Sequence, residues 1–138
     1  MRAFVIGVFV WISMALGATA QSALPPEKGI EDTIQGQVDA FLVDDFAGAF
    51  TFASPMIQGI FGSAERFGAM VKNGYPMVWR PAEVEFLDLR RVNGLPVQRV
   101  MVRDAAGKQH FLDYQMIPGE AGWLINGVSI VEAPGVAA

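Results

Sequence analysis

Two adjacent carboxylates, Asp44 and Asp45, are the side chains of this sequence best suited to acid–base chemistry. Neighbouring residues of a helix project about 100° apart, so only one of the two can face an enclosed pocket. An aspartate buried among phenylalanines has a raised pKa and can act as a general base. The structural alternative is a solvated helix bend, or an ion pair with Lys72 or Arg80. Asp44 and Asp45 are therefore candidate catalytic residues, and the structural alternative for them stays open.

Tyr75, Trp79 and Arg80 form a second candidate group, in which aromatic and basic side chains lie between two prolines. As a ligand-binding group they would rim a pocket, and Arg80 would hold a carboxylate through its bidentate fork. As a structural group they would comprise a turn at Tyr75, a core residue at Trp79, and an ion pair between Arg80 and one of the two aspartates. The sequence leaves both interpretations open.

Other catalytic and metal-binding chemistries have little support in the sequence. His110 is the only histidine and there is no cysteine, so a two-histidine site and thiolate chemistry are excluded. No segment has the alternating Asp/Asn pattern with a central glycine that a calcium loop needs. Ser54 lies between Ala53 and Pro55, outside any G-x-S-x-G motif. We expect no metal site, no cofactor, and a partly exposed strand histidine at His110.

The elements that must position these residues begin with helices. Apolar residues at helical spacing predict a helix from Ile30, whose pattern continues to Phe50 with a possible bend at Asp44–Asp45. Two shorter helices are predicted by capping residues, since a serine precedes each and a glycine ends each. These helices begin after Ser54 and Ser63 and end near 62 and 74.

After residue 82 the apolar period changes to two, which predicts strands. Asn93–Gly94 is a hairpin signal, and a change of parity near Phe86–Leu87 indicates a bulge. Arg99 and Arg103 share a strand face, which predicts pairing with Asp113 or Gln115 across the next hairpin, or a dimer surface. The predicted strands are 83–91, 97–103, 109–117 and 123–131. Helices followed by antiparallel strands predict an α+β domain, with the helices packed on a curved four-stranded sheet.

The N-terminus has the pattern of a secretory signal. A basic start at Arg2 precedes the apolar run 3–16 and the small residues 18–20, which predicts cleavage before Gln21 and a periplasmic or secreted protein. The alternative is a retained membrane anchor, for which the apolar run is short. The predicted organisation is a signal at 1–20, a flexible leader at 21–29, one domain at 30–132 and a tail at 133–138.

The composition narrows the classes of partner. The chain carries 10 basic and 14 acidic residues, and removing the signal takes away only one of the basic ones. Mild acidity with scattered basic residues argues against nucleic acid as a partner. Membrane contact is expected only through the signal before cleavage. A chain of this length can bury a core without disulfides.

Several short motifs together resemble a known family. They are the run from Asp44 through Phe52-Ala53-Ser54-Pro55, then Ile57 with Phe61-Gly62, then Phe67 through Gly74-Tyr75-Pro76 to Arg80-Pro81, and finally Trp123, Ile125 and Gly127. The sequence resembles the secreted bacterial family described as domain of unknown function 4864. That resemblance implies export and a compact α+β domain, and it implies no reaction. In layout the chain is also similar to the nuclear-transport-factor-2-like, or cystatin-like, cone fold.

Three functions are consistent with these features. The first is non-enzymatic binding of a small apolar or amphipathic molecule, or of a protein partner, at an aromatic-rich interface between helices and sheet. The second is a cone-fold enzyme for proton transfer or hydrolysis with an aspartate base. The third is a homodimerisation module that assembles through the outer face of the sheet.

Overall fold

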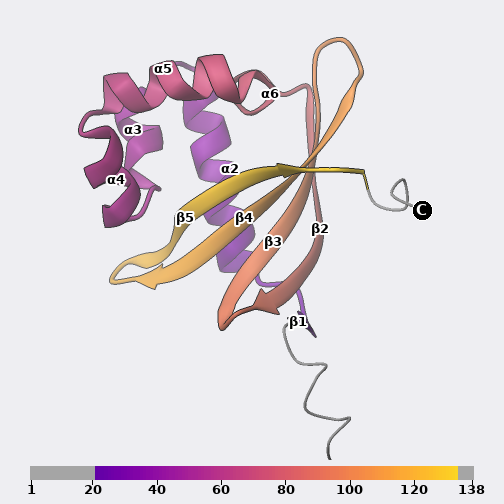
Figure 1. Ribbon diagram of the computed structural model, residues 1–138. Helices are drawn as coiled ribbons and strands as arrows, with labels where there is room; N and C mark the ends of the chain where they lie inside the picture. Colours follow the sequence, from indigo (N-terminus) through magenta and orange to yellow (C-terminus); the bar gives the residue numbers. More distant parts are fainter. Residues whose placement is uncertain (1–20, 134–138) are drawn as a thin grey trace, which may run out of the picture.

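Helices pack against one face of an antiparallel sheet in the computed structural model, which describes residues 21–133 (Figure 1). The long helix α2 passes behind the sheet, and the remaining helices form a cap at one end of it (Figure 1). The elements in chain order are β1 (Gln21–Leu24), α2 (Lys28–Leu42), α3 (Phe46–Thr51), α4 (Pro55–Phe61), α5 (Ala64–Gly74), α6 (Pro76–Trp79), β2 (Glu83–Val92), β3 (Leu95–Arg103), β4 (Gln109–Gly119) and β5 (Gly122–Val131). The predicted α+β class is confirmed.

The sheet has five strands in the order β1-β2-β3-β4-β5, and every neighbouring pair is antiparallel. Four of them are the predicted strands, with ends that differ by two residues or fewer. The fifth, β1, lies in the segment expected to be a flexible leader, and it pairs from Gln21↔Val92 to Leu24↔Leu89. Strand β1 forms because the free edge of β2 presents unpaired backbone N–H and C=O groups to it. The sequence did not predict the strand because this segment has little strand propensity of its own.

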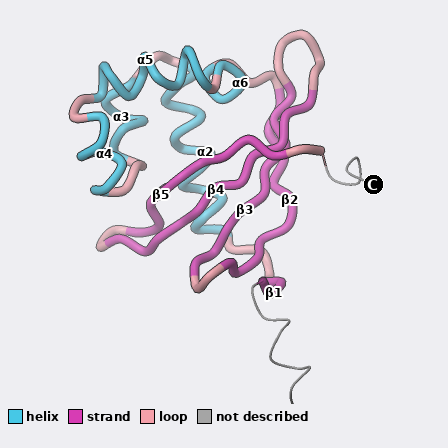
Figure 2. Tube along the Cα trace, in the orientation of Figure 1, coloured by secondary structure: helices cyan, strands magenta, loops and turns pink. Residues whose placement is uncertain are grey.

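The helical half is more divided than expected. The predicted bend is confirmed, because α2 ends at Leu42, Asp44 has a left-handed φ of 57°, and α3 begins at Phe46. An extra short helix, α6, follows Tyr75, where a turn was expected (Figure 2). Pro76 starts this helix, since proline's fixed φ suits a first helical position.

The serine caps formed as predicted. The Ser54 hydroxyl accepts a hydrogen bond from the Ile57 amide at the start of α4, and the Ser63 hydroxyl accepts one from the Arg66 amide at the start of α5. Each satisfies an amide that has no partner within its helix. Gly62 ends α4 with a φ of 81°, which a glycine adopts without steric cost.

The predicted bulge in β2 is confirmed, with a register shift between Phe86 and Leu89. Its backbone is held by Gln98, a buried residue of β3 whose amide nitrogen donates to the Leu87 carbonyl at 3.0 Å and to the Asp88 carbonyl at 3.4 Å. The hairpin that follows has positive φ at both Asn93 and Gly94, as a type I′ turn requires. The bulge and the tight turn together set the register of the sheet.

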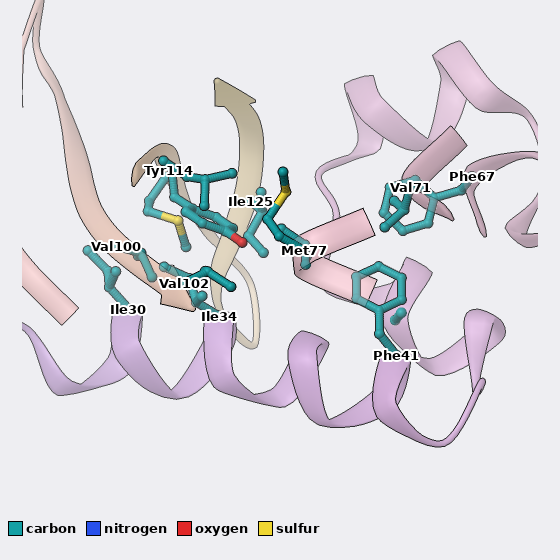
Figure 3. Close-up of a cluster of buried hydrophobic side chains, with 14 of the residues drawn as sticks. Ile30, Ile34, Phe41, Phe67, Val71, Met77, Val100, Val102, Tyr114 and Ile125 are labelled. Atoms are coloured by element: carbon teal, nitrogen blue, oxygen red, sulfur yellow. The ribbon is translucent and has the colours of Figure 1, made fainter. Parts of the chain in front are cut away.

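The core lies between α2 and the sheet (Figure 3). One stripe of α2 is buried, and it faces alternate residues of β3 and β4. The fully buried members of this layer include Ile30, Ile34, Phe41, Val100, Val102, Leu112, Tyr114 and Met116. Phe67 of α5 completes the core at the helical end, where its ring lies 5.9 Å from that of Phe41. No helix within residues 21–133 is long and apolar enough to cross a membrane.

Candidate functional site

A pocket of about 240 Å³ lies where the helical cap meets the sheet. Helices α2, α4, α5 and α6 line it from one side and strands β4 and β5 from the other. Its wall is formed by Gln37, Phe41, Ala53, Ile57, Phe61, Phe67, Met70, Val71, Tyr75, Val78, Tyr114, Ile125, Gly127 and Val128. Because most of these side chains are aliphatic or phenyl groups, the pocket suits a molecule with an apolar body.

Contacts between phenylalanine rings link the aromatic residues of the pocket wall. The Phe67 ring has its centre 5.9 Å from that of Phe41 and 5.8 Å from that of Phe61, in a stacked and an edge-to-face arrangement respectively. Both geometries are favourable for aromatic pairs. Phe50, outside the wall, supports Phe67 from behind at 5.2 Å. These ring contacts restrict the movement of the aromatic side chains in the wall.

One buried amide breaks the apolar lining. Gln37 lies on the buried stripe of α2 and is 4 % exposed. Its amide nitrogen donates to the Ala49 carbonyl of α3 at 3.2 Å. A carbonyl can only accept, so this contact fixes which end of the amide carries the nitrogen. The amide oxygen accepts no hydrogen bond from the described residues.

Two tyrosines also reach the pocket. The Tyr75 hydroxyl donates to the Val128 carbonyl of β5 at 3.0 Å. Tyr114 is 1 % exposed, its hydroxyl points away from β4 into the space between sheet and helices (Figure 3), and it forms no hydrogen bond within residues 21–133. Burial, with a smaller effect of Tyr75, raises the pKa of the Tyr114 hydroxyl well above its ordinary value. The group is therefore a neutral phenol that can donate and accept.

The candidate base Asp44 lies outside the pocket wall. Its carboxylate accepts two hydrogen bonds from the Arg80 guanidinium, at 3.0 and 3.1 Å, and one from the Trp79 indole at 2.9 Å. These hydrogen bonds, that of Trp79 first, hold the pKa of Asp44 below its ordinary value. The side chain is 52 % exposed. A base needs an enclosed carboxylate with a raised pKa, and Asp44 has neither property.

Asp45 has a local role at the same bend. Its side chain accepts a hydrogen bond from the Gly48 amide at 2.9 Å and caps α3. The bend between α2 and α3 therefore occupies both aspartates, one in an ion pair and one in a cap. Of the two ion pairs that the sequence allowed for Asp44, the structure forms the one with Arg80.

The second candidate group, Tyr75, Trp79 and Arg80, does not lie at one site. Tyr75 lines the pocket, whereas Trp79 and Arg80 lie with Asp44 at the bend after α2. The Arg80 guanidinium stacks 4.2 Å from the Trp79 ring and donates to the Phe41 carbonyl at 2.7 Å, which covers the end of α2. Arg80 therefore binds a carboxylate of this chain, in the bidentate manner considered for a ligand.

Ser54 joins the helical cap to the sheet. It is fully buried, and its hydroxyl lies 2.8 Å from the Asn126 amide oxygen, to which it donates. The backbone beside it pairs with β5, because the Ser54 amide donates to the Ile125 carbonyl and the Ile125 amide donates to the Phe52 carbonyl. These contacts hold the pocket's helical wall against β5.

The outer face of the sheet carries a charged cluster, formed by Arg90, Arg99 and Asp113. Arg99 lies directly opposite Asp113, as predicted, and contacts both carboxylate oxygens at 2.8 and 2.9 Å. Arg90 adds a contact of 2.7 Å. Burial tends to raise the pKa of Asp113, but the hydrogen bonds from Arg99 and Arg90 outweigh it and hold that pKa below its ordinary value. Arg103 pairs with Glu83 instead of a β4 residue.

His110 lies at the start of β4 and contacts Asp104 through its Nε2 atom at 2.9 Å. This contact, followed by the backbone amide of Lys108, lowers the pKa of Asp104. The pair closes the turn between β3 and β4. Within residues 21–133 no group of three or more histidine, aspartate or glutamate side chains is placed to hold a metal ion.

Gln37 and Tyr114 are pocket residues that sequence reasoning missed. Gln37 occupies a position of the buried stripe of α2, so a polar residue on an apolar helix face was the available signal. Tyr114 shares a strand face with Leu112 and Met116, so the signal available in the sequence was a hydroxyl on an apolar face of the predicted strand 109–117. A polar atom at a predicted core position is a signal for a site even where no motif accompanies it.

Comparison with known proteins gives one match. The family described as domain of unknown function (DUF4864) matches residues 23–138. Neither the curated proteins nor the solved structures gave a match. The predicted family resemblance is confirmed, and the similarity of layout to the cone fold stays a prediction.

Proposed function

Because the chain belongs to the family described as domain of unknown function (DUF4864), which carries no assigned activity, we propose from the pocket that it is a non-enzymatic binding domain for a small, mainly apolar molecule. The observation that carries the proposal is the apolar pocket of about 240 Å³ between the helical cap and the sheet. A cavity of about 150 Å³ in another protein binds benzene, so this volume is enough for a substituted ring.

The energy for binding would come from burial of the ligand's apolar surface. Each square ångström of apolar surface removed from water contributes about 25 cal/mol, and the rigid wall lowers the ordering cost on binding. The aromatic pairs formed by Phe41, Phe61 and Phe67 supply that rigidity. Export through residues 1–20, which lie outside the described residues, stays a prediction, and it would place binding in the periplasm or outside the cell.

Ligand-dependent stability tests this proposal. Ethylbenzene in excess should raise the unfolding midpoint of the purified protein, because a ligand that binds only the folded state stabilises it by about 2.7 kcal/mol at one hundred times its Kd. Val71→Phe should abolish the rise by placing a ring inside the pocket. Ile130→Phe adds the same ring on the exposed end of β5, outside the wall, and should keep the rise.

Two results would contradict the proposal. One is an unchanged unfolding midpoint of the unmodified protein with ethylbenzene. The other is an equal rise in the Val71→Phe variant, which would place binding elsewhere. The homodimer expectation is separate, and light scattering of the purified protein tests it.

A further inference from the structure

Two polar atoms on buried residues of the pocket wall have hydrogen-bonding capacity that residues 21–133 leave unused. They are the amide oxygen of Gln37 and the hydroxyl of Tyr114, on residues that are 4 % and 1 % exposed. Neither is fully enclosed, because Gln98 Oε1 of β3 is the one fully enclosed side-chain polar atom without a partner among these residues. A few polar atoms in a mainly apolar pocket usually fix the orientation of the bound molecule. A pocket wall with two polar atoms that have no partner within residues 21–133 is suited to a ligand that pairs them.

The remaining polar groups at the pocket are occupied. Tyr75 donates to the Val128 carbonyl, and the amide nitrogen of Gln37 donates to the Ala49 carbonyl. No lysine, arginine, histidine, aspartate or glutamate is among the described residues that form the wall. An ion held there would lose its hydration without gaining a counter-charge, which is strongly unfavourable.

The unused atoms define the matching ligand group. The Tyr114 hydroxyl can donate to a ligand oxygen, and the Gln37 oxygen can only accept a ligand hydrogen. A neutral hydroxyl group offers both an acceptor and a donor, whereas a hydrocarbon offers neither and a carboxylate carries a charge. The phenyl groups of the wall favour a flat ring as the apolar body, since offset and edge-to-face contacts between rings are favourable.

We propose that the pocket selects a neutral molecule of about alkylphenol size, whose hydroxyl oxygen accepts a hydrogen bond from Tyr114, with Gln37 as an acceptor for a polar hydrogen of the ligand. The proposal rests on the proposed function and adds the chemical class of the ligand. It assigns specificity to two side chains that packing against the protein does not fully explain.

Three probes of similar shape separate the possibilities: 4-ethylphenol, ethylbenzene and 4-ethylbenzoate. Their dissociation constants are measured by NMR titration of the unmodified protein and of Tyr114→Phe. We expect the unmodified protein to bind 4-ethylphenol about fivefold more tightly than ethylbenzene, which is the effect of one net hydrogen bond, and to bind 4-ethylbenzoate least. Tyr114→Phe should remove this preference and leave ethylbenzene binding within about twofold.

Thr33→Val is the matched control, because it removes a hydroxyl from α2 that donates to the Trp123 carbonyl and lies outside the pocket wall. It should keep the preference for 4-ethylphenol. Gln37→Met is a second test. It should weaken the affinity for 4-ethylphenol by about two- to fivefold, and an unfolding curve confirms that the variant folds.

Each outcome has a defined meaning. Equal binding of 4-ethylphenol and ethylbenzene, or a preference that survives Tyr114→Phe, overturns the inference and leaves the proposed function standing. Tightest binding of 4-ethylbenzoate overturns the neutral class. Absence of binding by all three probes overturns the proposed function together with this inference.

Discussion

Asp113 and Tyr114 follow one another on β4, and their side chains lie on opposite faces of the sheet. On the outer face, the Asp113 carboxylate is surrounded by donors from Arg90 and Arg99. On the inner face, Tyr114 is the more deeply buried residue, and its hydroxyl has no partner within residues 21–133. The outer face therefore carries the charged side chains, which are paired. The inner face carries a neutral hydroxyl whose hydrogen-bonding capacity is unused within residues 21–133.

Whether a polar group finds a partner within the chain separates a structural role from a possible binding role. A charged group that is fully paired within the chain is explained by its structural role, and Asp44 at the bend after α2 follows the same rule. A neutral polar group that lines a pocket and has no partner within residues 21–133 can still pair with a bound molecule. The candidate site is therefore better identified by unpaired polar atoms that line the pocket than by charged residues.

The largest loss of stability is expected for a pocket residue of α2, which packs on the inner side of the sheet. Phe41→Ala should lower the free energy of unfolding by about 3–5 kcal/mol, because it removes a fully buried ring and leaves a cavity beside the pocket. Urea unfolding monitored by circular dichroism measures the loss. Val43→Ala, two residues away and 75 % exposed, should change stability by less than about 0.5 kcal/mol. A loss below about 1.5 kcal/mol for Phe41→Ala would mean that the pocket wall collapses onto the gap.

Asp113→Asn tests the outer face and is expected to cost about 2–3 kcal/mol at pH 7, because it leaves two half-buried arginines without their carboxylate. Asp32→Asn, which breaks an exposed pair with Lys28, should cost less than about 1 kcal/mol. Equal losses in the two variants would contradict a structural role for the Arg90–Asp113–Arg99 cluster.

The same variant predicts a pH dependence. The pKa of Asp113 is lower in the folded chain than its ordinary value of 3.8, so its stabilising effect is complete above that value and is lost as the pH falls through the folded pKa. The stability difference between the unmodified protein and Asp113→Asn should therefore shrink below about pH 4. Urea midpoints measured from pH 7 to pH 3 check this, and a difference that grows on acidification would contradict it.

Ser54 tests how firmly the helical cap is joined to the inner face. Ser54→Ala should cost about 1–2 kcal/mol, because it removes the cap of α4 and the partner of the Asn126 oxygen. Ser63→Ala removes an exposed cap alone and should cost about 0.5–1 kcal/mol. Thermal unfolding of both variants gives the comparison, and a larger loss for Ser63→Ala would refute the proposed link to β5.

The smallest expected effect distinguishes a paired hydroxyl from an unpaired one. Tyr75→Phe should cost about 1 kcal/mol, because the Val128 carbonyl loses its donor. Tyr114→Phe should cost less than about 0.5 kcal/mol without a ligand, since no residue of the described part of the chain, 21–133, forms a hydrogen bond with that hydroxyl. Urea unfolding of both variants is the measurement. A cost for Tyr114→Phe equal to that of Tyr75→Phe would show that its hydroxyl has a partner after all.

Much of the fold could be predicted because its signals are local. Ser54 and Ser63 cap helices through amides three residues away, and the Asn93–Gly94 turn depends on two positive φ angles. The strand faces followed from a period of two, and the short hairpin predicted pairing of Arg99 and Arg103 with Asp113 or Gln115, of which the structure forms Arg99 with Asp113. Each of these outcomes depends on residues that are near in sequence or joined by a short hairpin.

The site was less predictable because its parts are distant in sequence. Gln37 and Tyr114 come from α2 and β4, and only the packing of helices on the sheet brings both to one pocket. Strand β1 likewise forms because the edge of β2 lies beside it, and Arg80 reaches Asp44 across 36 residues.

The sequence by itself therefore determined the family, the α+β class, the caps, the turns and the alternation of the strands, since all are set by short-range backbone and side-chain physics. The tertiary structure decided which polar groups find partners within the chain. Pairing depends on distances between elements, which no local pattern contains. Asp44 and Asp113 lie within hydrogen-bonding distance of arginines, whereas the Tyr114 hydroxyl lies in the pocket wall without a partner among residues 21–133.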